Sequence, residues 1–417
     1  MIKKTYTKHK ETVHNFIWRA LQIGAKQGIV FLIFILCAKF LTPYDFGIYN
    51  YALAIVFFLI IFGDFGISTA TSKYVAEYNV TNKGKLKAVL FNSGIIILAL
   101  TIIVSILTLI LGPWYLKDKY IYILYLLPLI FLAPMTSLYD GIYRGLKKFK
   151  QLAIISIVIG LFSLIFVYFL IAQYGLIGAL IAQNLFYLIL LIGLGLGYRD
   201  FSFKLNKEVM KEVTKYSIIV GIAGLGFFFF TRVNVLILGY FNLIEEIGYY
   251  EIINKVILIL LIPSTILAQV ISPEVTNMYY RKENKKLIKE YKKYLIFSAL
   301  IGLITILLVS VSFLPLVILF LPKYNSSLLF YSMLILSPLL ITQSISNIAS
   351  VGFSTSSGYA RLNMYFLLIF GVINIILSSF LVWYMGYMGI IYSTLIAKGI
   401  ADILFIIIYF RIIKNEK

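Results

Sequence analysis

The chain has 417 residues, of which 61% are apolar and only 13% carry a charge. A soluble domain has about 45–50% apolar and about 25% charged residues, so this chain has too little charge to cover a water-exposed surface. Disorder is excluded as well, because it requires low hydrophobicity and many charges. The composition therefore indicates an integral membrane protein.

Twelve apolar runs are long enough to cross a bilayer, which takes about 20 residues of helix. The predicted spans are 17–41, 48–72, 89–112, 120–142, 151–171, 175–197, 215–240, 247–272, 291–319, 328–350, 362–383 and 387–410. The first run follows a short basic tail, but it is too long for the apolar core of a signal peptide and no small-residue cleavage site follows it. We therefore expect an all-α membrane protein with twelve transmembrane helices, the first of them retained.

The net charge of +20 follows this topology. With a cytoplasmic N-terminus and alternating spans, most of the 37 lysines and arginines fall on the cytoplasmic side. The predicted outer loops hold Lys39, Lys117, Lys119 and Lys323. This positive-inside asymmetry predicts a multi-pass protein of the cell membrane with both termini in the cytoplasm. The charge thus indicates topology and contact with anionic membrane lipids rather than nucleic acid.

An internal repeat relates the two halves of the chain. A shift of 201 residues aligns the second and eighth spans, and a shift of 211 aligns the fifth and sixth spans with the last two. The matched pairs include Gly47–Gly248, Tyr49–Tyr250, Gly160–Gly371, Leu170–Leu381, Gly175–Gly386 and Gly178–Gly389. We expect two six-helix bundles, 1–197 and 215–417, joined by a cytoplasmic linker over 198–214. A pseudo-two-fold axis along the membrane normal would relate them, with the substrate site between the halves.

Residue types that carry catalysis or bind metals are scarce. Cys37 is the single cysteine, and the two histidines, His9 and His14, lie in the charged N-terminal tail. The sequence has no Gly-x-x-x-x-Gly-Lys-Ser/Thr phrase for nucleotide phosphates. We expect no catalytic residues, no metal site and no cofactor, so directionality would need an ion gradient or consumption of the product.

Several charges lie inside the predicted spans, where each Lys or Arg costs about 2.5–3.5 kcal/mol unless it meets a partner or a water-filled cavity. Lys26 and Arg232 have no acidic residue three or four positions away. Each of them either extends its charge to the membrane surface, pairs with Asp64 across the helix packing, or contacts a ligand. Lys255 lies four residues after Glu251, so it serves either a helix ion pair or a ligand. Unpaired positive charge exceeds unpaired negative charge, which suits an anion such as phosphate. Asp64 is a counter-ion or a coupling-ion site, and the sequence does not separate the two.

Other polar residues in the spans have two interpretations each. Lys398 and Asp402 are four residues apart on one helical face, and we expect them to pair with each other. Asn234, Asn254 and Gln269 either hydrogen-bond to sugar hydroxyls or serve the packing between helices. We include these three residues, with Lys26, Arg232 and Lys255, in a candidate substrate-binding set.

Three phrases resemble the polysaccharide transporter family. They are KFLTPYDFGIY at 39–49, GDFGISTA at 63–70 followed by YVAEY at 74–78, and YGLIGA at 174–179. With the span count and the repeat, the likeness covers essentially the whole chain. This family belongs to the multidrug, oligosaccharidyl-lipid and polysaccharide exporter (MOP) superfamily.

The resemblance implies a flippase that moves oligosaccharides carried on polyprenyl phosphate or diphosphate to the outer leaflet by alternating access. It also implies a cavity lined by spans 1, 2, 7 and 8, where Lys26, Asp64, Arg232 and Lys255 fall. Proteins of cell-envelope glycan assembly would be its partners. The alternatives are a multidrug exporter of the same superfamily, which would favour acidic cavity residues, and a polytopic glycosyltransferase or polysaccharide polymerase. An enzyme of that kind normally displays a sizeable hydrophilic loop, which this chain lacks, so we expect no enzyme.

Overall fold

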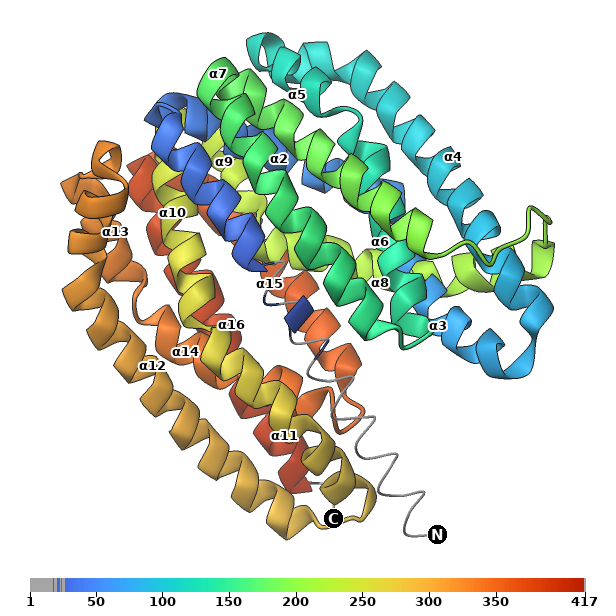
Figure 1. Ribbon diagram of the computed structural model, residues 1–417. Coiled ribbons are helices and arrows are strands. Elements are labelled where there is room, and N and C mark those ends of the chain that lie inside the picture. Colours follow the sequence, from blue (N-terminus) through green and yellow to red (C-terminus); the bar gives the residue numbers. More distant parts are fainter. Residues whose placement is uncertain (1–17, 19–20, 23, 25–26, 416–417) are drawn as a thin grey trace. The chain divides into compact units, whose positions relative to one another are not determined.

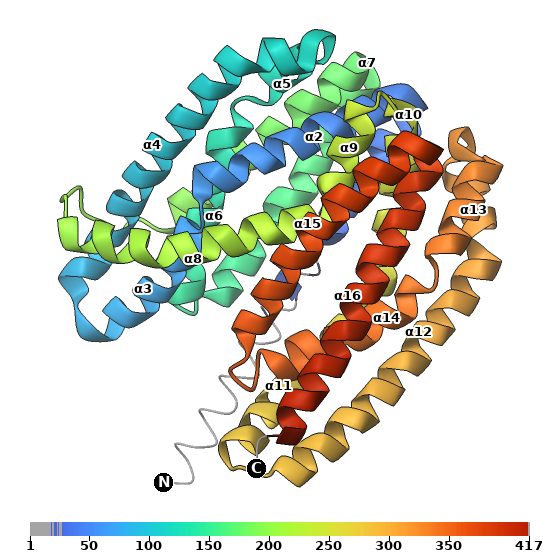
Figure 2. The same ribbon diagram turned by 180° about the vertical axis from the view of Figure 1, so that it is seen from behind.

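The computed structural model describes residues 18, 21–22, 24 and 27–415, and these residues form helices joined by short loops, without strands. The chain divides into two compact units, Met1–Gly224 (unit 1) and Leu225–Lys417 (unit 2), with the boundary inside helix α8. Figures 1 and 2 show the helices of both units from opposite sides. The all-α prediction is confirmed. The six-helix bundles 1–197 and 215–417 and their two-fold relation stay predictions.

The first continuously described helix of unit 1 is Gln27–Phe40. Its further helices are α2 (Pro43–Asp64), α3 (Ile67–Thr81), α4 (Lys83–Leu116), η1 (Lys117–Lys119), α5 (Tyr120–Leu126), α6 (Leu129–Gly145), α7 (Phe149–Gly197) and the first part of α8 (Lys207–Thr231). Helix α2 is the most buried of the apolar helices, and α4 and α6 pack against it. Helix α7 covers two predicted spans, with a kink at Gly175 between them.

Unit 2 contains the end of α8 and eight further α-helices or helical turns before its C-terminal hairpin. They are α9 (Val233–Tyr240), α10 (Ile244–Leu260), α11 (Ile262–Tyr280), α12 (Asn284–Phe320), η2 (Pro322–Tyr324), α13 (Ser327–Leu336), α14 (Leu339–Asn347) and the π-helix η3 (Ile348–Ser354). The chain ends with α15 (Ala360–Met385) and α16 (Tyr387–Asn415), which run side by side in both ribbon views.

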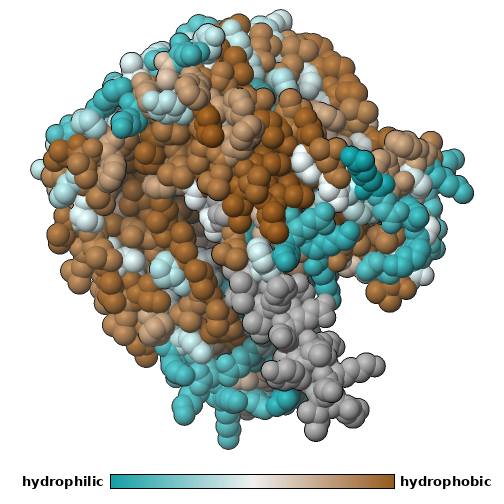
Figure 3. Space-filling model, in the orientation of Figure 1, coloured by the Kyte–Doolittle hydropathy of each residue, from teal (hydrophilic) through white to brown (hydrophobic). Residues whose placement is uncertain are grey.

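The apolar helices match the predicted membrane spans in length and composition. Within the part of the chain that the structure describes, six helices are long and apolar enough to cross a bilayer, and the bent pairs α10–α11 and α13–α14 raise the number to eight. The count of twelve stays a prediction. Apolar side chains on α12 face outward, and Val311 is 78% exposed. Figure 3 shows this face of unit 2 as hydrophobic, with hydrophilic residues at the turn between α11 and α12. Such a surface requires lipid around it, so the protein is a multi-pass membrane protein.

Local sequence signals set several helix starts. The Thr42 hydroxyl accepts a hydrogen bond of 3.1 Å from the Asp45 amide, and Pro43 follows at the first helical position. The Asn82 side chain caps α4 in the same way, through the Lys85 amide at 3.0 Å. Each cap satisfies an amide that has no partner within the helix. The phrase at 39–49 therefore encodes a helix start.

The repeated glycines have the same backbone geometry in both units. Gly175 and Gly386 have φ values of 53° and 60°. A Cβ atom on Gly178 would lie 1.9 Å from the Leu170 carbonyl oxygen, and one on Gly389 would lie 2.1 Å from that of Leu381. Glycine is needed at all four positions, because a side chain would be strained or would collide with backbone. The shift of 211 residues thus reflects the same backbone conformation at the junction between two helices in both units.

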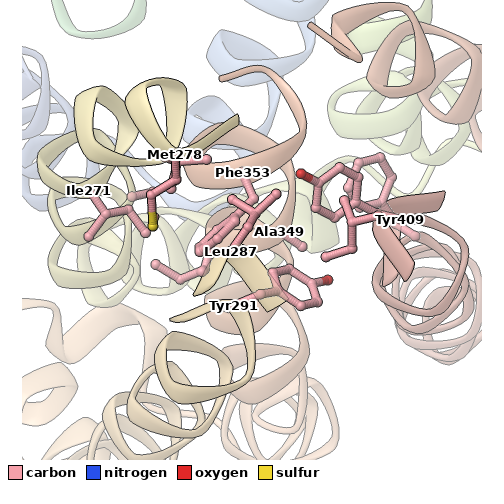
Figure 4. Close-up of a cluster of buried hydrophobic side chains, with 12 residues drawn as sticks. Ile271, Met278, Leu287, Tyr291, Ala349, Phe353 and Tyr409 are labelled. Atoms are coloured by element: carbon pink, nitrogen blue, oxygen red, sulfur yellow. The ribbon is translucent and has the colours of Figure 1, made fainter. Parts of the chain in front are cut away.

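A buried aromatic cluster forms the core of unit 2 where α11, α12, η3 and α16 meet. Tyr291 of α12 packs edge-on against Phe353 and Tyr409, with ring centroids 5.0 and 5.4 Å apart. Figure 4 shows these rings directed toward one another, with Met278 and Leu287 beside them. Because these side chains are nearly inaccessible, this end of unit 2 is a packed core.

The segment 198–206 has no regular secondary structure and is held against the start of α4. The Ser202 amide donates to the Lys87 carbonyl oxygen at 2.8 Å, and the Asn206 amide donates to Asn92 Oδ1 at 2.8 Å. At the start of α8, Glu212 accepts hydrogen bonds from the Tyr78 hydroxyl and from Lys85. The first part of the predicted linker is therefore fastened to unit 1.

Candidate functional site

The candidate site of unit 2 begins at Arg232, where the helical path from α8 to α9 is interrupted. Arg232 has φ −124° and ψ −18°, and α9 starts at the next residue. Its guanidinium lies 3.6 Å from Glu251 Oε2 of α10. The Glu251 side chain is 4% exposed, whereas that of Arg232 is 36% exposed. The partner of Arg232 therefore comes from the next helix and not from its own.

Lys255 joins this pair. It lies one turn after Glu251 on α10, and it is within electrostatic range of both Glu251 and Arg232. The structure thus brings together two of the predicted cations around one buried carboxylate. The three formal charges sum to one positive charge, and we name Arg232, Glu251 and Lys255 the cation cluster. Such a cluster can bind an anion, since Arg offers a planar pair of donors and Lys a mobile point charge.

Asn234, two residues further on, has a different environment. Its Nδ2 donates to the Tyr250 hydroxyl at 2.8 Å and to Thr394 Oγ1 at 2.7 Å. Its Oδ1 accepts from Asn374 Nδ2 at 3.0 Å and from Ser378 Oγ at 3.2 Å. Asn234 is 1% exposed, and all four of its hydrogen-bonding positions are filled. In this arrangement it has no capacity left for a sugar hydroxyl, and it fastens α9 to α10, α15 and α16.

The two other predicted amides do not join the cation cluster by any described contact. Asn254 is half-buried on α10, and Gln269 is exposed on α11, beyond the bend between these helices. Their role in substrate binding stays a prediction.

In unit 1, Asp64 ends α2 at a sharp break. The next two residues, Phe65 and Gly66, have φ values of 37° and 80°. Both the amide and the hydroxyl of Ser68 donate to Asp64 Oδ1, at 2.9 and 2.6 Å. Asp64 therefore stabilises the start of α3, and among the described residues Arg144 is a cation within its electrostatic range. Lys26 lies outside the described residues.

Lys398 and Asp402 of α16 are both buried, but they are not among the ion pairs of the described chain. The Asp402 carboxyl group instead hydrogen-bonds to Ser346 and Thr342 of α14, and Lys398 acts on it only electrostatically. The sequence alone could not find these hydroxyl partners, because they lie more than 50 residues away from Asp402.

The described residues contain no group of three or more His, Cys, Asp or Glu side chains that could hold a metal ion. The described part of the site consists of cations, carboxylates, amides and hydroxyls.

Comparisons with known proteins agree with this architecture. The model of a family described as "polysaccharide biosynthesis protein" matches residues 12–279. No curated protein matches the chain. Among solved structures, a multidrug resistance MATE family transporter of the MOP superfamily in an inward-facing conformation has a TM-score of 0.80 at 15% identity, covering 96% of this chain and 99% of the other.

Two further structures have the same fold. A MOP superfamily transporter from Pyrococcus furiosus has a TM-score of 0.67 at 15% identity, covering 97% of this chain and 96% of its own. A eukaryotic MATE transporter has a TM-score of 0.67 at 16% identity, covering 97% and 98%. The family model covers more than half of the chain, in agreement with the phrases at 39–49 and 63–78. The protein is therefore a member of the polysaccharide biosynthesis protein family, and it has the fold of transporters of the MOP superfamily.

Proposed function

We propose that the protein is a flippase for oligosaccharides linked to polyprenyl phosphate or diphosphate, and that it moves them from the cytoplasmic to the outer leaflet of the cell membrane. The observation that carries the proposal is the cation cluster of unit 2, in a chain of a polysaccharide biosynthesis family. Lys26 is the further cation proposed for the site. Both termini would lie in the cytoplasm, and proteins of envelope glycan assembly would be partners.

The chemistry of the cluster suits a phosphate headgroup. Moving a phosphate from water into the apolar part of a bilayer is costly unless fixed cations replace its hydration. The Arg232 side chain is partly exposed and can turn from Glu251 to a ligand. Two N–H groups of its planar guanidinium can then donate to two phosphate oxygens. Each charge-assisted hydrogen bond contributes about 1.5–3 kcal/mol. Two such contacts would strengthen binding by about 100-fold or more.

Multidrug export is the second candidate, because the inward-facing structure with a TM-score of 0.80 is that of a multidrug resistance transporter. A binding site for cationic drugs requires carboxylates in excess, whereas the cation cluster has two cations for one carboxylate. For the Pyrococcus furiosus relative, a reversed polarity of the binding pocket has been taken to suggest a different function. Pocket polarity is therefore the feature that separates the two candidates.

The test uses the full chain in proteoliposomes and two substrates. The first is a fluorescent polyprenyl-diphosphate-linked oligosaccharide, whose arrival in the outer leaflet is read by quenching, and the second is the cationic dye ethidium. We expect transport of the lipid-linked oligosaccharide, and the double variant Arg232→Ala/Lys255→Ala should bind it about 100-fold more weakly.

Arg411→Ala is the matched control, because Arg411 is an exposed arginine at the end of α16. It should transport as the wild type does. Ethidium export without movement of the lipid-linked oligosaccharide would establish the multidrug candidate instead. Unchanged binding in the double variant would refute the role of the cation cluster.

A further inference from the structure

The three carboxylates discussed above, all within the predicted spans, differ in their partners. Asp64 Oδ1 is held by the amide and hydroxyl of Ser68. Glu251 pairs with Arg232. Asp402 of α16 is different, because its Oδ2 atom is buried without a hydrogen-bond partner among the described residues. An unpartnered buried oxygen is costly, and its presence calls for an explanation.

The surroundings of Asp402 are buried and polar. Asp402 is 7% exposed, and Lys398, one turn earlier on α16, is 8% exposed. Thr342 and Ser346 of α14 hydrogen-bond to the carboxyl group. Helices α9, α12, α13, α14 and α15 and the π-helix η3 pack against α16, but in their described residues no charged side chain acts on Asp402. Lys398 is the cation that does so.

This arrangement suits a proton better than a metal ion. A carboxylate without a direct ion pair is unfavourable in an apolar interior, and protonation removes its charge. Protonation also turns one carboxyl oxygen into a donor, and the hydroxyls of Thr342 and Ser346 can accept as well as donate. A metal ion would need several further oxygen ligands, and the Lys398 ammonium would repel it.

We propose that Asp402, with Lys398, Thr342 and Ser346, forms a buried proton-binding site in unit 2. One proton adds to the Asp402 carboxylate to give the neutral acid, and its release restores the carboxylate, without any other bond change. Lys398, one turn earlier on α16, is the charged neighbour of this carboxyl group. A further role of this proton as the coupling ion of transport rests on the proposed function.

The test is infrared spectroscopy of the full-length protein in lipid nanodiscs during a pH titration. A C=O stretching component of a buried carboxylic acid should appear on acidification of the wild type, and this component should be missing from the same titration of Asp402→Asn. Asp200→Asn is the control, since Asp200 is a surface residue paired with Lys87 at 3.2 Å. It should leave the band of the buried acid unchanged. A band that persists in Asp402→Asn would overturn the proposal.

Two further variants report on the site if Asp402→Asn does not fold. Lys398→Met removes the stabilising cation, and Thr342→Val removes a donor to the carboxylate, so both should move the titration to higher pH. A titration identical to that of the wild type in both variants would refute the assignment. Replacing potassium by sodium at constant ionic strength should not shift the pH titration of the Asp402 band. A sodium-dependent shift of this titration would show a metal-ion site instead.

The infrared measurement needs no transport, so it separates this inference from the proposed function. A titrating Asp402 band in a protein that moves no lipid-linked oligosaccharide would support the proton site and refute the flippase. If both hold, transport in Asp402→Asn should lose its response to an imposed pH gradient, and a retained response would refute the coupling role.

Discussion

The hydrogen bonds of Asn234 give the sharpest test of how unit 2 is held together. The change to Ala removes four hydrogen bonds at once, to Tyr250, Thr394, Asn374 and Ser378. Each buried hydrogen bond contributes about 0.5–1.5 kcal/mol net, so the loss should be about 4 kcal/mol. Its four partners stay buried and each of them loses one hydrogen bond, which adds to the cost.

The measurement is thermal unfolding of the purified protein in detergent, followed by intrinsic fluorescence. For a unit of this size, 1 kcal/mol shifts Tm by roughly 2–4 °C, so Asn234→Ala should lower Tm by about 8–16 °C. Asn254→Ala is the matched control, because Asn254 is half-buried on α10 and surface-like substitutions usually change stability by less than about 0.5 kcal/mol.

An unchanged Tm in Asn234→Ala would refute the structural role. A normal Tm together with weakened binding of the lipid-linked oligosaccharide would instead show that Asn234 binds substrate. The two roles thus give opposite patterns in the same two measurements.

Two further changes test unit 1. Gly178→Ala should destabilise the protein by about 1–3 kcal/mol, because the added Cβ atom would collide with the Leu170 carbonyl oxygen. Gly94→Ala is the control: its Cβ atom would lie 3.9 Å from the nearest atoms, so the change should be neutral or stabilising by up to about 1 kcal/mol. Equal Tm values in the two variants would contradict this geometry. The hydrogen bond from Tyr78, with those from Lys85, lowers the pKa of Glu212. The stability that Glu212 contributes is therefore complete above its ordinary pKa of about 4.3 and is lost as the pH falls through the lower folded value. Glu212→Gln should lower Tm at neutral pH, and its difference from the wild type should close on acidification, whereas a constant difference would show that the effect is not electrostatic.

Features that depend on near neighbours in the chain could be predicted from the sequence. Long apolar runs predict membrane helices, because every backbone polar group in lipid must be satisfied within the helix. Thr42 and Pro43 predict a helix start through contacts three residues away. The paired glycines at a shift of 211 residues predict two corners of the same geometry, which Gly175 and Gly386 show.

The pairing of side chains across helices was decided by the tertiary structure. Arg232 has no acidic residue within one turn, yet Glu251 of another helix lies 3.6 Å away. Lys398 and Asp402 have the spacing of an ion pair, yet the carboxyl group turns to Thr342 and Ser346. A spacing along one helix limits which side chains can meet, but packing between helices determines which contacts form. Whether a buried polar residue still has a free hydrogen-bonding position is therefore a property of the fold.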